Sequence, residues 1–191
     1  MSAHTIATTR SATGIPTGRL AIWWVLVSEI VIFGGVLVSY IMHRLGHPEW
    51  GHQAAHTNLW IGAFNTLVLL SSSLSAVLAH KAAEEGNGPR AARLLFATVA
   101  GGATFLTVKG FEWTEEITHG MTIQSGGFWS YYYTAAGIHA THVLAGMIIM
   151  VVIAMSALKN QGLHRVELVG IYWHFVDIVW IFLFPLLYIA K

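Results

Sequence analysis

Residues 20–42 read LAIWWVLVSEIVIFGGVLVSYIM, and this stretch decides the class of fold. Its one charged side chain is Glu29, and a helix of this length crosses the roughly 30 Å of hydrocarbon in a bilayer at about 1.5 Å per residue. Four further apolar stretches follow, at residues 59–79, 94–116, 129–158 and 168–190. We therefore predict an all-α integral membrane bundle of five transmembrane helices. The stretch 94–116 is the least apolar of the five, and 129–158 is longer than a span requires.

The composition agrees with a membrane protein and excludes several functions. Hydrophobic residues make up 55% of the chain and charged residues 10%, whereas soluble domains average about 25% charged residues. The net charge of +1 and the lack of a Lys/Arg-rich run argue against a nucleic-acid partner. The absence of cysteine excludes disulfides, thiolate metal sites, Fe–S clusters and a cysteine nucleophile.

Residues 1–19 are polar and rich in Ser and Thr, and we predict a disordered tail there, followed by one five-helix domain over 20–191. The basic residues predict the orientation, because cytoplasmic loops carry an excess of Lys and Arg. Seven basic residues would share one side: Arg10, Arg19, Lys81, Arg90, Arg93, Lys159 and Arg165. Only Arg44 and Lys191 fall on the other side. The N-terminus is therefore predicted to be cytoplasmic and the C-terminus outside.

The segment between the first two spans contains three histidines, His47, His52 and His56, beside glycine and proline. We interpret it as a hydrated loop rather than a metal site.

Aromatic residues near the helix ends, among them Trp23, Trp24 and Tyr131 to Tyr133, are typical of an interfacial belt. Glycines within the spans predict close helix packing: Gly34, Gly35, Gly101, Gly102, Gly137 and Gly146.

Ionisable residues inside the spans are the candidates for function, because each costs about 2.5–3.5 kcal/mol at the centre of a membrane helix. Glu29 and Asp177 lie at similar depth in the first and last spans, and His174 lies one turn from Asp177. We therefore expect a cluster of Glu29, His174 and Asp177. Glu29 is either a proton-relay carboxylate or a structural hydrogen-bonding group, and the sequence leaves both interpretations open.

A second ionisable set lies in the third and fourth spans. Lys109 and Glu112 are three residues apart on one helix face, which predicts an internal ion pair, and Glu116 continues that face. His139 and His142 share a face of the fourth span. Two such histidines can bind a metal or haem, but hydrogen bonds to neighbouring helices are the more frequent role. Neither His139 nor His142 belongs to a Glu-x-x-His pair, so no di-iron site is expected there.

Several motifs together resemble subunit III of the haem-copper cytochrome c oxidases, in its short five-helix bacterial form. The stretch YWHFVDIVW over 172–180, which includes Trp173, resembles the signature of that family, with Glu167 seven residues before His174. Further matches follow in order along the chain: Ser28-Glu29, Asn65-Thr66-Leu67, His80, Glu112 with Glu115, and Gly137-Ile138-His139 with His142-Val143-Leu144.

The resemblance implies a non-catalytic subunit of a proton-pumping oxidase in the bacterial inner (plasma) membrane. Such a subunit carries no redox centre or metal, packs on subunit I, and supports proton uptake and the stability of the catalytic centre. Haem and copper are expected in the partner subunits I and II, and bound phospholipid in this chain. Glu29 would be a buried functional carboxylate near subunit I. A polar network, or lipid contacts, would involve Asn65, His80, Lys109, Glu112, Glu115, His139, His142, Glu167, Trp173, His174 and Asp177.

Other functions remain open at this stage. A quinol oxidase subunit III and the accessory protein of nitric oxide reductase share the form and the motifs, although Glu29 favours cytochrome c as the electron donor. A small proton-coupled transporter is supported only by the buried charges, and no paired broken helices accompany them. An independent haem or metal protein would rest on His139 and His142 alone.

Overall fold

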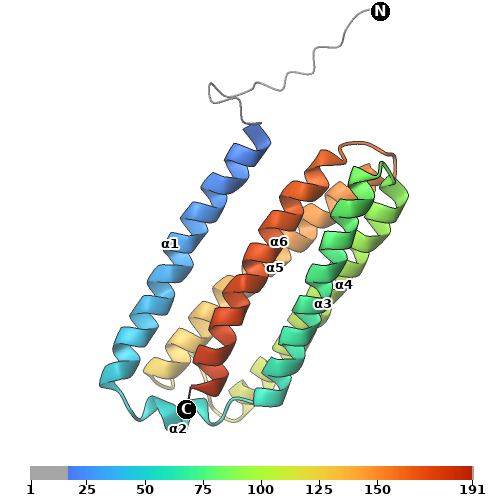
Figure 1. Ribbon diagram of the computed structural model, residues 1–191. Helices are drawn as coiled ribbons and strands as arrows, with labels where there is room; N and C mark the ends of the chain where they lie inside the picture. Colours follow the sequence, from blue (N-terminus) through green and yellow to red (C-terminus); the bar gives the residue numbers. More distant parts are fainter. Residues whose placement is uncertain (1–16, 191) are drawn as a thin grey trace, which may run out of the picture.

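The computed structural model describes residues 17–190, and all its regular structure is helical. The elements run α1 (Thr17–Gly46), α2 (Trp50–Ala54), α3 (Leu59–Glu84), α4 (Gly88–Thr118), α5 (Gly127–Ala157) and α6 (His164–Phe184). A short π-helix, η1 (Pro185–Ile189), continues α6. The long helices alternate in direction, so that the connections lie at the two ends of the bundle (Figure 1).

Five of these helices are long and apolar enough to cross a membrane, which confirms the predicted bundle of five spans. The third predicted span, the least apolar, is the 31-residue helix α4. Asn87 caps its start by accepting a hydrogen bond from the Arg90 amide at 3.1 Å, and Pro89 lies in the first turn. Helix α1 begins at Thr17, so residues 17–19 of the predicted tail are helical, while residues 1–16 lie outside the described residues.

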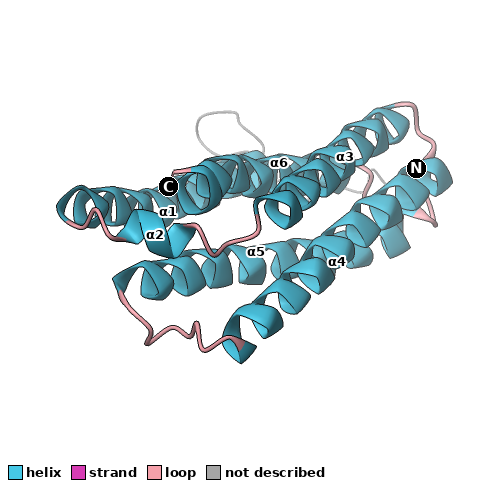
Figure 2. Cartoon of the chain, turned by 90° about the horizontal axis from the view of Figure 1, so that it is seen from below, coloured by secondary structure: helices cyan, strands magenta, loops and turns pink. Residues whose placement is uncertain are grey.

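The spanning helices form two layers, with α1, α6 and α3 in one and α5 and α4 in the other (Figure 2). Close packing between α3, α4, α5 and α6 depends on small residues. A Cβ atom on Gly101 would lie 2.6 Å from the Cβ of Ser72, and one on Gly102 would lie 2.8 Å from the Trp173 ring. The predicted packing role of these glycines is confirmed, and it lets the fully buried Trp173 lie between helices.

Helix α1 is peripheral to this four-helix core. Only 11% of the most apolar 18-residue stretch of α1 is buried. The corresponding fraction is 50% in the span formed by α6 and η1. Gly34 and Gly35 make no close helix contact among residues 17–190, because a Cβ atom on either would have no neighbour within 4 Å there. Figure 1 shows α1 at the edge of the bundle, alongside α6.

The expected loop between the first two spans contains the helix α2. Its Trp50 is buried, and the ring fills the space beside Gly127, where an added Cβ would come within 2.4 Å of it. Trp50 also packs against Tyr40 and Tyr131, with ring centroids 5.9 and 5.7 Å away. The burial of this aromatic side chain fixes the segment against the bundle, so the prediction of a simple hydrated loop was incomplete.

Candidate functional site

Glu29 of α1 is paired with His142 of α5, across the gap between the peripheral helix and the core. Oε2 of Glu29 lies 2.8 Å from Nε2 of His142. Nδ1 of the same ring lies 2.8 Å from the carbonyl oxygen of Ile138, and because a carbonyl only accepts, Nδ1 is the donor. This contact brings an acidic and a basic side chain from two spanning helices together.

The Glu29–His142 pair lies on the wall of a large cavity between α1, α5 and α6. The cavity has a volume of about 1110 Å³ and extends from Thr17 at the start of α1 down to Glu29. Most of its wall is apolar, with Ile22, Ile149 and Leu168 among the lining residues. Its lining residues all come from these three helices, and an ion pair bridges α1 and α6 at the end where α1 begins. Glu29 is thus 15% exposed and His142 20% exposed, although both belong to spanning helices.

Charged residues surround the end of this cavity at the start of α1. Arg19 forms an ion pair with Glu167 of α6, with Nη2 and Oε1 2.7 Å apart. Arg165 and His164 also line the cavity there. Glu29 is ten residues from Arg19, which is about 15 Å along a helix at 1.5 Å per residue. The cavity is therefore basic at one end, apolar along its length, and bounded at depth by the Glu29–His142 pair.

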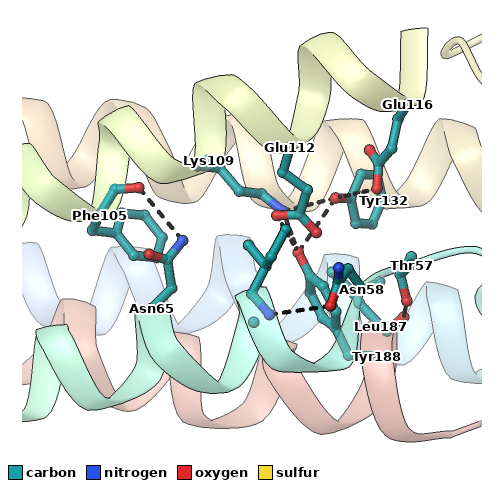
Figure 3. Close-up of polar contacts among 12 residues, drawn as sticks. Thr57, Asn58, Asn65, Phe105, Lys109, Glu112, Glu116, Tyr132, Leu187 and Tyr188 are labelled. Carbon is teal, nitrogen blue, oxygen red and sulfur yellow. Dashed lines mark hydrogen bonds and ion pairs between the residues drawn. The ribbon is translucent and has the colours of Figure 1, made fainter. Parts of the chain in front are cut away.

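A second polar site is buried between α4, α5 and η1 (Figure 3). The predicted ion pair is confirmed, with Nζ of Lys109 3.0 Å from Oε2 of Glu112 and side chains only 2% and 3% exposed. Lys109 also donates to the hydroxyl groups of Tyr132, at 2.8 Å, and of Tyr188. The Tyr132 hydroxyl in turn donates to Oε1 of Glu116 at 2.9 Å. We call this set of five residues the lysine network.

Aromatic rings complete the surroundings of the Lys109 ammonium group. Its Nζ lies 4.5 Å from the ring centroid of Tyr132, 5.0 Å from that of Tyr188 and 5.7 Å from that of Trp180. Such contacts attract a cation through the ring quadrupole. Sequence reasoning missed both tyrosines, because it assigned Tyr132 to the interfacial belt, whereas the structure buries it completely. A lysine in a spanning helix was the only signal that further partners must exist.

His139 and His142 occupy different environments, although they share the same helix. His139 is completely buried in the core and stacks on Trp180, with ring centroids 5.1 Å apart and an interplanar angle of 30°. Phe105 packs edge-on against the same imidazole at 5.4 Å. The fully buried Asn65 donates to the carbonyl oxygen of Phe105 at 3.5 Å. His139 and Asn65 are therefore core residues of the bundle, and only His142 reaches the cavity.

The expected cluster of Glu29, His174 and Asp177 is not formed. Glu29 pairs with α5, and His174 instead lies with Nδ1 2.5 Å from the hydroxyl group of Ser73 in α3. Asp177 is buried, and its carboxylate has no hydrogen-bond partner among residues 17–190. The prediction failed because α6 turns His174 toward α3 and away from α1.

Three other predicted site residues lie outside both polar sites. The Trp173 indole donates to the Ser72 hydroxyl group at 3.0 Å and fills the core. His80 lies 3.4 Å from Glu84 at the exposed end of α3. Glu115 is exposed on α4, close to the lysine network. Among residues 17–190, no three side chains of the His, Cys, Asp or Glu type are arranged to coordinate a metal ion directly.

Comparison with known proteins identifies the family. The family model described as cytochrome c oxidase subunit III matches residues 2–191. Cytochrome c oxidase subunit 3 of Corynebacterium diphtheriae is 35% identical over 173 residues, which cover 87% of this chain and 84% of that protein. The subunit 3 of Thermostichus vulcanus is 31% identical over 172 residues, covering 86% and 83% of the two chains.

A third relative differs in length. The haem-copper oxidase subunit I+III of Aeropyrum pernix is 30% identical over 183 residues, which cover 90% of this chain but 22% of that protein. The family match extends over nearly the whole chain, and the five spanning helices agree with the form that the motifs implied. This chain belongs to the cytochrome c oxidase subunit III family.

Proposed function

We propose that this chain is the non-catalytic subunit III of a proton-pumping cytochrome c oxidase in a bacterial plasma membrane. The observation that carries the proposal is the family match over residues 2–191. Membership of the family implies association with a haem-copper oxidase complex. The Aeropyrum relative, named subunit I+III, supports subunit I as the direct partner. In this proposal subunit II completes the complex, and the partner subunits hold haem and copper.

Within that complex we assign Glu29 and His142 to proton handling. Both groups face a cavity that reaches the end of the bundle predicted to be cytoplasmic, and Oε2 of Glu29 lies 2.8 Å from Nε2 of His142. A carboxylate and an imidazole at contact distance can pass a proton between them without moving net charge into the hydrocarbon. This geometry supports a role in sustaining proton uptake by subunit I.

The cavity itself supports a second assignment, a bound phospholipid. Its apolar length suits an acyl chain, and its basic end, with Arg19, His164 and Arg165, suits a phosphate group. A lipid held there would also cover the exposed sides of Glu29 and His142. The mass spectrum of lipids extracted from the purified complex tests this assignment. Loss of a stoichiometric phospholipid on Arg165→Gln is the expected result.

Co-purification tests the main proposal. The tagged chain is extracted gently from its native membranes, and the accompanying subunits, the reduced-minus-oxidised visible spectrum and oxygen consumption are recorded. We expect haem and copper to accompany the tag, with cyanide-sensitive oxidation of added cytochrome c. Oxidation of quinol instead of cytochrome c would assign the chain to a quinol oxidase. Co-purification of nitric oxide reductase subunits would assign it to that reductase. A chain that emerges alone and colourless would contradict the proposal.

A further inference from the structure

The layer formed by α1, α6 and α3 packs against α5 and α4 on one of its two sides (Figure 2). On the other side, the neighbouring helices α3 and α6 present a mainly apolar surface. Exposed aliphatic side chains make up most of this surface, together with one glycine and one histidine. We call it the α3–α6 face, and its residues are Leu70, Leu74, Gly170, His174, Ile178 and Ile181.

His174 is a half-buried polar side chain near the middle of a spanning helix. The span runs over His164–Ile189, and His174 lies ten residues from its start, which is about 15 Å along a helix. The imidazole Nδ1 lies 2.5 Å from the Ser73 hydroxyl oxygen. Nε2 has no hydrogen-bond partner among residues 17–190. One nitrogen of the ring is thus satisfied inside the bundle, and the other is not.

The bilayer does not supply a partner for Nε2 of His174 at this depth. The polar groups of phospholipids lie at the two surfaces, roughly 15 Å from the centre of the hydrocarbon. The hydrocarbon also lacks water that could bind the nitrogen. Polar side chains inside membranes are therefore paired with other protein groups. The position of His174 thus indicates a protein partner on the α3–α6 face.

Exposed hydroxyl groups elsewhere on the bundle show the contrasting, lipid-facing arrangement. Thr104 and Thr107 are exposed on α4, and each donates to the carbonyl oxygen four residues earlier, at 2.9 and 2.8 Å. Ser71 on α3 does the same at 2.8 Å. A hydroxyl group bonded within its own helix needs no outside partner, so lipid chains can cover it. Nε2 of His174 has no such bond.

The α3–α6 face also has room for a neighbouring helix beside His174. Gly170 lies four residues earlier in α6, and residues four apart share a helix face. A Cβ atom added to Gly170 would have no atom within 4 Å. Small residues of this kind let spanning helices approach each other closely. A partner helix that crossed α6 here would come within reach of the imidazole.

We propose that the α3–α6 face is a protein interface inside the membrane, covered by a spanning helix of another oxidase subunit that places a hydroxyl or amide side chain against Nε2 of His174. Hydroxyl and amide groups both donate and accept hydrogen bonds, so either tautomer of the imidazole is satisfied. The exposed aliphatic residues of the face pack around this bond. The inference rests on the proposed function, which supplies the partner subunit.

Photocrosslinking of the assembled complex tests the interface. The photoreactive residue p-benzoylphenylalanine replaces Ile178 on the α3–α6 face or, as the matched control, Leu144 on α5. The two side chains are 50% and 49% exposed and both lie in spanning helices. After illumination, the products are identified by mass spectrometry. We expect a crosslink from position 178 to another oxidase subunit, and only lipid adducts from position 144.

Two crosslinking results would overturn the inference: only lipid adducts from position 178, or a crosslink to a second copy of this chain. The experiment uses complexes that already contain the other oxidase subunits. Either result would therefore leave the proposed function standing.

Substitution of His174 tests the hydrogen bond itself. The readout is the fraction of haem-containing complexes that keep this chain as the detergent concentration rises. His174→Leu should lower that fraction about threefold, as expected for an average hydrogen bond between spanning helices, whereas His174→Gln should retain the chain through its amide. Ser73→Ala removes the internal bond of His174 and should behave as the wild type. Wild-type retention in His174→Leu, or an equal loss in Ser73→Ala, would contradict the proposed bond.

Discussion

The lysine network and the Glu29–His142 pair both place ionisable groups inside spanning helices, but they differ in enclosure. Lys109 and Glu112 are 2% and 3% exposed, and the lysine has hydroxyl groups and aromatic rings as further partners. Glu29 and His142 are 15% and 20% exposed and depend on each other beside a cavity. Enclosure with several partners suits a structural role, whereas one partner and an open wall suit the exchange of protons.

Removing the cation of the lysine network should have the largest effect. Lys109→Met leaves Glu112 buried beside two tyrosines, and breaking a buried pair in this way costs about 3–5 kcal/mol. Thermal unfolding of the purified complex, followed through a label on this chain, measures the loss. Lys81→Met, at an exposed position near the end of α3, is the control and should melt as the wild type does. An unchanged melting temperature of the Lys109→Met complex would contradict the structural role of the lysine network.

A smaller loss of stability is expected at Gly102, where the core packs without charged groups. Gly102→Ala would bring a Cβ atom within 2.8 Å of the Trp173 ring and 2.9 Å of the Met147 sulfur. Overpacking of this kind costs about 1–3 kcal/mol. Gly110→Ala in the same helix has no atom within 4 Å of the new Cβ and should stabilise α4 by about 0.5–1 kcal/mol. Opposite shifts in melting temperature are expected, and equal shifts would show that α4, α5 and α6 pack less closely than described.

The smallest effect on stability is expected at the charged end of the cavity. Arg19 and Glu167 are 54% and 27% exposed, so their ion pair is screened by solvent, and Arg19→Gln should cost less than about 1 kcal/mol. The same melting assay measures it, with Arg93→Gln as the control on the exposed side of α4. A loss as large as that of Lys109→Met would mean that α1 depends on this pair for its attachment to the core.

The comparison also explains what the sequence could predict. The five spans followed from length and apolar content, and the Lys109–Glu112 pair followed from a three-residue spacing within one helix. The partner of Glu29 could not be predicted, because it depends on which helix packs beside α1, and His142 is far away in the sequence. The burial of Tyr132 and Trp50 depends on tertiary packing in the same way. Local periodicity describes one helix, whereas function here depends on contacts between helices.

The most direct test of this account is the lifetime of the complex during turnover. Oxygen consumption is followed until it stops, in complexes that contain the wild-type chain, Glu29→Gln or the exposed control Glu84→Gln, at matched haem content. The account predicts earlier inactivation and slower proton uptake for Glu29→Gln, with an unchanged melting temperature, and wild-type behaviour for the control. An equal lifetime and rate for Glu29→Gln would contradict the proton-handling role of the Glu29–His142 pair.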